Sequence, residues 1–258
     1  MMINRIKKIF VLVVLFFCSL SMAWAQNYNI TDFGAVGDNQ TDNTIAIRKA
    51  IEKAATQGGT VIVPAGIFIT GTVELKSNVT LQLNKNGVIK GVADRSAYVP
   101  INVSYPLRNE ATPSRARALI YAVGKSNINI TGEGTVDGNG GDPVVDEKLN
   151  KNISRPYGMF FLSCNNLTVS NIHLTNSAMW MQHYLNCEDV IVSKVDVYNH
   201  SNRNNDGIDI DGCRRFIVSD CIFDSDDDGI TLKSTGPAPS EDVVITNCTV
   251  SSHCNAIT

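Results

Sequence analysis

Two short segments of this 258-residue chain hold carboxylates whose types and spacing are suited to acid/base chemistry. Residues 204–207 read NNDG and residues 226–229 read DDDG, so that Asp206 and Asp228 are 22 residues apart. Cleavage of a glycosidic bond by hydrolysis needs one carboxylic acid to protonate the leaving oxygen, and a second carboxylate to activate water or to attack the anomeric carbon. Crowded carboxylates repel one another, so one of them keeps its proton to a higher pH than the rest. Asp206 and the aspartates of residues 226–228 are therefore candidates for an acid/base site.

An internal repeat indicates how these residues are brought together. Alternating apolar and polar runs at residues 167–174, 190–197, 216–223 and 243–250 read LTVSNIHL, VIVSKVDV, FIVSDCIF and VVITNCTV, at spacings of 23, 26 and 27 residues. Similar runs begin near residues 77 and 126. Alternation with period two is typical of half-buried strands, and repeats of about 20 to 50 residues are typical of solenoids and propellers. Short strands and little helical pattern after residue 60 favour a parallel β-helix, in which Asp206 and Asp228 lie on adjacent coils.

An acidic run by itself would be a solvated turn, but the position of residues 224–228 indicates more. The run follows a predicted strand at residues 216–223, lies one repeat after Asp206, and leads into a further alternating strand at residues 228–233. Residues 93–117 and 138–155 are irregular and polar, so we expect loops that overhang the solenoid and help to form a binding surface.

The amino-terminal end of the solenoid has a recognisable cap. Residues 44–55 predict a helix that ends before Gly58 and Gly59, with Asp42 or Asn43 as its N-cap. Its apolar face contains Ile45, Ile47, Ala50, Ile51, Ala54 and Ala55. Residues 60–63 then predict the first buried strand. No comparable cap is visible at the other end, so we expect a single β-helix domain over residues 26–258 whose carboxy-terminal coils are missing, with an exposed edge.

The first 25 residues have the pattern of a secretory signal peptide. Arg5, Lys7 and Lys8 precede an apolar run at residues 9–20 and then Ala23-Trp24-Ala25, which predicts cleavage after Ala25 and a secreted or periplasmic protein. The apolar run is short for a membrane anchor. Loss of this segment would change the formal net charge from −3 to −6. The remaining chain has no basic cluster, which disfavours a nucleic-acid partner.

The cysteines follow the repeat. Cys164, Cys187 and Cys213 occupy equivalent positions, as do Cys221 and Cys248. This pattern favours a ladder of small buried thiols, although export leaves a disulfide between neighbouring coils open. No Cys-x-x-Cys spacing occurs, which disfavours a cysteine metal site.

The sequence resembles glycoside hydrolase family 28, the polygalacturonase family of pectin-degrading right-handed parallel β-helices, over nearly all of residues 26–258. Residues 30–38, 41–44 and 58–66 resemble the amino-terminal cap of that family. The family's Asn-Thr-Asp, followed one coil later by Asp-Asp, is matched by residues 204–206 and by Asp227 and Asp228, with Asn205 in place of the threonine.

The resemblance implies an inverting hydrolase that acts on a pectic polysaccharide, either a galacturonan or a rhamnogalacturonan. Asp227 would protonate the departing oxygen, Asp206 and Asp228 would activate water, and Asn204 would orient this group by hydrogen bonding. The implied enzyme needs no metal or organic cofactor. We further expect a monomer with neither a membrane nor a nucleic-acid partner.

Residues that bind the substrate are less specific. Residues 177–183 resemble the cleft segment of the family, so Trp180 and His183 are candidate sugar contacts, with packing as the alternative. His253 or Asn255 would replace the histidine of the family's Gly-His-Gly motif, and an Arg-x-Lys motif would lie beyond residue 258. Endo or exo action stays open. Two rival functions use the same scaffold: a calcium-dependent polysaccharide lyase, and a non-catalytic carbohydrate-binding or adhesin β-helix.

Overall fold

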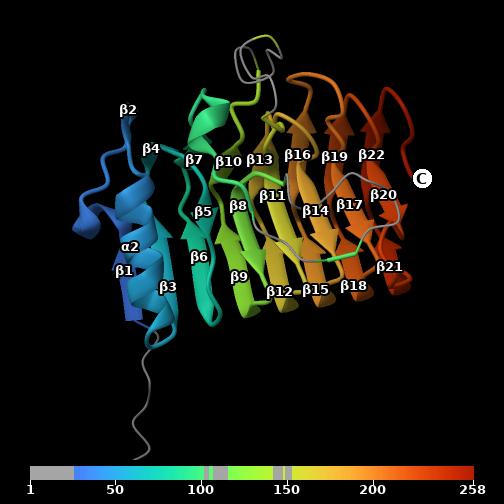
Figure 1. Cartoon of the computed structure of the whole chain (residues 1–258), viewed down its shortest axis with the longest axis horizontal. Coiled ribbons are helices and arrows are strands. Elements are labelled where there is room, and N and C mark those ends of the chain that lie inside the picture. Colours follow the sequence, from blue (N-terminus) through green and yellow to red (C-terminus); the bar gives the residue numbers. More distant parts are fainter. Residues whose placement is uncertain (1–25, 102–104, 107–115, 142–147, 149–152) are drawn as a thin grey trace, which may run out of the picture.

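The protein is a right-handed parallel β-helix closed at its amino-terminal end by one helix (Figure 1). This computed structural model describes residues 26–101, 105–106, 116–141, 148 and 153–258. The predicted signal peptide lies outside these residues, as do parts of the two predicted loops. Helices long and apolar enough to span a bilayer are not found in the described part of the chain. The predicted fold class is confirmed.

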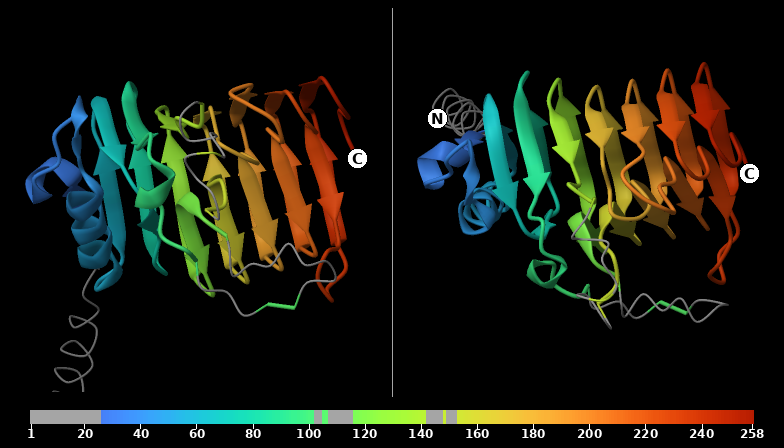
Figure 2. Two further views of the ribbon diagram at one scale, coloured as in Figure 1. Left: turned by 45° about the horizontal axis from the view of Figure 1, so that its top comes forward. Right: turned by 90° about the horizontal axis from the view of Figure 1, so that it is seen from above.

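Three parallel sheets run along the solenoid (Figure 2), with eight strands in each of the first two and six in the third over the described residues. The first sheet contains β1 (Gln26–Asn29), β3 (Gly59–Val63), β6 (Val79–Leu83), β9 (Ser126–Gly132), β12 (Asn165–Ser170), β15 (Glu188–Ser193), β18 (Arg214–Ser219) and β21 (Glu241–Thr246). The second contains β2 (Asp38–Asp42), β4 (Gly66–Thr70), β7 (Gly87–Gly91), β10 (Thr135–Asp137), β13 (His173–Thr175), β16 (Asp196–Asn199), β19 (Ile222–Ser225) and β22 (Thr249–Ser252). The third contains β5 (Val73–Glu74), β8 (Ala118–Val123), β11 (Tyr157–Leu162), β14 (Gln182–Leu185), β17 (Ile208–Asp211) and β20 (Ile230–Lys233). Two 3₁₀ turns, η1 (Ile30–Phe33) and η2 (Arg95–Ala97), complete the described elements.

The sequence repeat corresponds to the axial register of the coils. Val169 pairs with Val192, which pairs with Val218, at the 23- and 26-residue spacings of the repeat. All three side chains are fully buried, so these three coils stack valine on valine inside the solenoid. The prediction of one strand at residues 216–223 was wrong, because Asp220 has a left-handed backbone (φ 57°) and bends the run into β18 and β19.

Asparagines located where successive strands of the first sheet begin hold neighbouring coils in register. Asn78, Asn127 and Asn166 all have left-handed backbones, which asparagine adopts at lower cost than most residues. The side-chain amide of Asn127 donates to Asn78 (2.7 Å), and that of Asn166 donates to Asn127 (2.8 Å). The repeated polar residues therefore have a structural role, which is to set the height of each coil along the axis.

Helix α2 (Thr44–Ala55) covers the first coil at the predicted boundaries. Its buried stripe differs from the prediction at one end, because Ala46 is buried while Ile45 is 69% exposed and faces away from the solenoid. Of the two predicted N-cap residues, Asp42 accepts a hydrogen bond from the backbone N–H of Thr44 (2.9 Å). Asn43 instead accepts from the N–H of Val36 (2.7 Å) and so anchors the loop before the helix.

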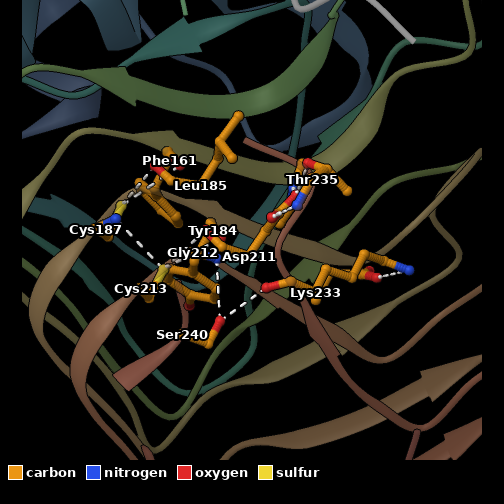
Figure 3. Close-up of polar contacts among 12 residues, drawn as sticks. Phe161, Tyr184, Leu185, Cys187, Asp211, Gly212, Cys213, Lys233, Thr235 and Ser240 are labelled. Carbon is orange, nitrogen blue, oxygen red and sulfur yellow. Dashed lines mark hydrogen bonds and ion pairs between the residues drawn. The ribbon is translucent and has the colours of Figure 1, made fainter. Parts of the chain in front are cut away.

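The six cysteines in the described part of the chain are free. Cys164, Cys187 and Cys213 are buried at the start of successive coils, and the backbone N–H of Cys187 donates to the sulfur of Cys213 at 3.3 Å (Figure 3). The predicted ladder of buried thiols is confirmed for Cys164, Cys187, Cys213 and Cys221, whereas Cys248 is only partly buried, and no disulfide joins these residues.

Gly207 allows the two acidic turns to stack closely, and we predict that its replacement by alanine destabilises the protein. A Cβ atom at residue 207 would lie 2.6 Å from the carbonyl oxygen of Gly229 and 2.8 Å from the ring of Phe223. Gly207→Ala should therefore lower the free energy of unfolding by about 1–3 kcal/mol, the usual cost of overpacking. Urea denaturation measures this change. The matched control is Gly141→Ala, where a Cβ meets nothing within 4 Å; equal effects of the two substitutions would contradict the prediction.

Candidate active site

The candidate catalytic residues lie in loops that join the second sheet to the third. The loop between β16 and β17 carries Asp206, and the loop between β19 and β20 carries Asp227 and Asp228. Strand β17 pairs with β20 so that Ile208 is opposite Ile230, and the N–H of Gly207 donates to the carbonyl oxygen of Asp228 (2.9 Å). The 22-residue offset predicted from the repeat is therefore the register of these two coils.

Asp206 is the most buried of the three aspartates. Its side chain is only 4% exposed, and its Oδ1 atom has no hydrogen-bond donor among the described residues. Burial raises the pKa of Asp206 to about 6; Asp227 and Asp228 raise it as well, while Lys233 opposes the shift. Asp227 and Asp228 are only partly buried, so their carboxyl groups reach the surface above Asp206.

Lys233 is the cation of this site. Its Nζ atom lies 2.8 Å from Oδ1 of Asp209 and 3.8 Å from Oδ2 of Asp206, and it stands 4.3 Å from the ring centroid of Trp180. Burial alone would lower the pKa of Lys233, but the two carboxylates outweigh it and the pKa is raised. Asp209 is fully buried, which raises its pKa well above the usual range. One positive charge thus faces two buried carboxyl groups, which ionise as a coupled pair.

Asn204 contacts the side chain of Asp227 and is itself held by Arg155. The amide of Asn204 donates to Oδ2 of Asp227 (3.3 Å), and its oxygen accepts from Nη2 of Arg155 (2.6 Å). Asn204 has a left-handed backbone (φ 56°), a conformation that asparagine tolerates. Asn204 therefore contacts one of the candidate catalytic residues. Arg155 comes from the irregular segment before β11 and was not predicted.

Asn205 anchors the loop from below. Its side chain is fully buried and donates to the carbonyl oxygens of Ser177 (2.8 Å) and Met179 (3.1 Å). Its own oxygen accepts from the backbone N–H of Asn202 (2.6 Å). An amide can donate and accept at the same time, so asparagine at this position ties the loop to the preceding coil.

His253 and Asn255 are the two alternatives for the histidine of the family motif, and the structure gives them different partners. Asn255 donates from its amide to Oδ1 of Asp228 (2.7 Å), whereas His253 places Nδ1 2.6 Å from Oδ1 of Asp226. Of the two, Asn255 is therefore the residue that contacts a candidate catalytic group.

Trp180 and His183 are buried to different extents. Trp180 is half-buried beside Lys233. His183 is 6% exposed, its ring is enclosed by Tyr157, Phe160 and Trp180, and burial lowers its pKa. Its Nε2 atom faces Oδ2 of Asp211 (3.3 Å). His183 thus supports Trp180 from within rather than presenting its ring to a ligand.

Asp211 is held from the opposite side by Thr235, whose backbone N–H donates to Oδ1 at 2.8 Å (Figure 3). Strand β17 reads IDID, so that both Asp209 and Asp211 are buried in a strand. Two acids that alternate with isoleucines are unusual in a strand. Together with Lys233 on the neighbouring strand, this pattern could have predicted a buried charge cluster from the sequence.

We predict that Asp206 reduces the stability of the fold at neutral pH. Its pKa is about 6 in the folded protein, against about 3.9 in an unfolded chain. The folded state therefore binds the proton more tightly, and the free energy of unfolding falls as the pH rises between these two values. The charged or titratable groups that face Asp206 are Lys233, Asp209, Asp227, Asp228 and Tyr157.

Asp206→Asn removes this ionisation, so the variant should melt at a higher temperature than the natural chain above pH 6 and at the same temperature near pH 4. The measurement is thermal denaturation across that range. Asp94→Asn is a control of opposite sign, because hydrogen bonds from Ser96 lower the pKa of Asp94 and make its ionised form stabilising at neutral pH. A pH-independent difference for Asp206→Asn would contradict the prediction.

The sequence and the structure are similar to those of known polygalacturonases. A family model described as "Glycosyl hydrolases family 28" matches residues 54–254. A Vitis vinifera protein described as "Probable polygalacturonase" is 32% identical over 221 residues, covering 81% of this chain and 45% of that protein. An exo-poly-alpha-D-galacturonosidase of Dickeya chrysanthemi is 28% identical, covering 79% of this chain and 41% of that protein. The solved structure of a Thermotoga maritima exopolygalacturonase is 29% identical with a TM-score of 0.72, covering 88% of this chain and 62% of that one. The chain thus spans less than half the length of these two curated relatives.

Proposed function

Because the chain belongs to glycosyl hydrolase family 28, we propose that the gene product containing it hydrolyses glycosidic bonds in a pectic polysaccharide. The observation that carries this proposal is the stacking of Asp206 beneath Asp227 and Asp228 on adjacent coils, with a separate polar partner for each upper carboxylate. Three carboxyl groups in different environments supply both an acid and a base.

The different degrees of burial support a division of roles. Asp227 and Asp228 are both partly buried, and we assign protonation of the oxygen of the departing sugar to Asp227, which Asn204 orients and whose position resembles that of the family's acid. A water molecule attacks the anomeric carbon from the opposite side and loses its proton to Asp228 or Asp206. The bond to the leaving oxygen breaks as the bond to water forms, which inverts the configuration at that carbon. If Asp206 is the group that accepts this proton, it must be ionised, and the reaction then slows as the pH falls below about 6.

The surroundings of the acids support the rest of the assignment. The half-buried Trp180 offers an aromatic surface for a sugar ring next to the cation of Lys233. Residues 1–25 have a signal-peptide pattern, which supports a secreted or periplasmic enzyme. We propose that it acts as a monomer.

The experiment is to incubate the gene product with polygalacturonate and, separately, with rhamnogalacturonan, each in the presence of calcium and again with a calcium chelator. We expect new reducing ends to form. NMR of their anomeric protons should show that the anomer formed first has the inverted configuration. A product with ultraviolet-absorbing double bonds that needs calcium would replace the hydrolase with a lyase. Binding of either polymer without any new reducing ends would replace it with a carbohydrate-binding β-helix.

A further inference from the structure

A second group of polar side chains lies beside the candidate catalytic residues and has no part in the proposed reaction. His200 follows β16, Asp226 follows β19 and His253 follows β22, so the three residues come from successive coils at the same place in the repeat. Oδ1 of Asp226 lies 3.0 Å from Nδ1 of His200 and 2.6 Å from Nδ1 of His253. The two imidazole rings meet edge to face, with centroids 5.4 Å apart.

The other nitrogen of His200 is already held by a carboxylate. Its Nε2 atom lies 2.8 Å from Oδ1 of Asp224. An ionised carboxylate only accepts hydrogen bonds, so Nε2 carries a proton and Nδ1 needs either a second proton or a cation in order to face Asp226. Histidines that bind metals almost always donate their other ring N–H to a carboxylate, carbonyl or water, which fixes the tautomer and the orientation of the ring.

The ligand atoms of His200, Asp226 and His253 lie close enough together to bind one metal ion with little movement of the side chains. One ligand atom from each of His200, Asp226 and His253 lies within 4.8 Å of the others. Zinc binds histidine nitrogen and carboxylate oxygen at about 2.0–2.2 Å, so two of its ligand atoms lie roughly 3–4 Å apart. Two imidazoles and one carboxylate suit Zn²⁺ and its transition-metal neighbours, whereas Ca²⁺ and Mg²⁺ prefer ligand sets made of oxygen.

We propose that His200, Asp226 and His253 bind a divalent transition-metal ion of the Zn²⁺ type, with Asp224 as the residue that orients His200. The ion would join three successive coils at their acidic loops. Asp226 immediately precedes Asp227, so the ion would also fix the turn that carries the candidate acid. Its role is positional, because none of its three ligands is one of the candidate catalytic aspartates.

The test is a titration of the untagged, metal-free protein with Zn²⁺ by isothermal calorimetry, repeated with Co²⁺ by visible absorption. We expect one equivalent to bind, with cobalt bands typical of nitrogen and oxygen ligands and without a thiolate charge-transfer band. His253 is 74% exposed, so His253→Ala should fold normally while weakening Zn²⁺ binding by about 100-fold or more. Asp224→Asn should weaken it by about 10- to 100-fold, as is usual for a residue that orients a ligand.

Two further variants locate the site. His173 faces Asp196 at 3.2 Å in an exposed pair for which the described residues offer no third ligand, so His173→Ala should leave Zn²⁺ binding unchanged. Asp227, Asp228 and Cys254 form another group of possible ligands. Binding that survives His253→Ala but is lost in Cys254→Ser would place the ion there and overturn the proposal. The proposal would also be overturned if the natural protein bound no Zn²⁺, or if His173→Ala and His253→Ala weakened binding equally.

Discussion

Asp227→Asn and Asp228→Asn should each reduce the release of reducing ends from the pectic substrate by about 10²–10⁴-fold, the range typical of a lost general acid or base. The substitution keeps the size of the side chain and removes its ability to exchange a proton. Both residues are only partly buried, so the melting temperature should change little. The measurement is kcat/KM of the gene product together with a thermal melt of each variant.

Asp220→Asn is the matched control for this experiment. Asn247 donates to Asp220 across the same 27-residue interval by which Asn255 donates to Asp228, but Asp220 is exposed at the bend between β18 and β19. Asp220→Asn should therefore retain full activity. Full activity in Asp227→Asn or Asp228→Asn would refute the assignment of these residues.

A substrate with an activated leaving group separates the two roles. An aryl glycoside whose phenol leaves without protonation does not need the general acid, so Asp227→Asn should recover most of its activity on this substrate. Asp228→Asn should not recover, because water still has to be activated. The reverse pattern would exchange the roles of the two aspartates.

Lys233→Met should destabilise the fold by about 3–5 kcal/mol, because it leaves the fully buried Asp209 without its cation. Urea denaturation measures the loss. The double variant Asp209→Asn/Lys233→Met removes both charges and should recover most of the stability, since an uncompensated buried charge costs more than the absence of the pair. A double variant no more stable than Lys233→Met alone would contradict this explanation.

Lys76→Met provides the control for a surface ion pair. Lys76 contacts Glu74, and each side chain is about one third exposed, so we expect a change of about 1 kcal/mol or less.

In the active protein, Lys233→Met should also move the acid limb of the pH–activity profile to higher pH. Lys233 favours the ionised form of Asp206, so its loss raises the pKa of that carboxyl group further.

Much of this architecture was determined by sequence alone, because a solenoid repeats its local rules. Alternating runs at spacings of 23, 26 and 27 residues determined which strands are neighbours, and hence that Asp206 and Asp228 would stack. The cap helix could be predicted to the residue, since the glycines after it and Asp42 before it act locally. The thiol ladder followed from the same equivalence of positions.

Only the tertiary structure decided what surrounds the acids. Asp209 and Lys233 lie on the paired strands β17 and β20, and Arg155 lies in the segment before β11, so only the folded chain shows that their side chains gather around the acids. The depths of His183 and Trp180 were also undetermined, because a strand pattern shows which residues alternate but not how far each is covered by neighbouring coils. His253 and Asn255 are two residues apart in a short loop, so only the path of that loop assigns one to Asp226 and the other to Asp228. A repeat determines which coils are neighbours, whereas the environment of a charge depends on every group packed around it.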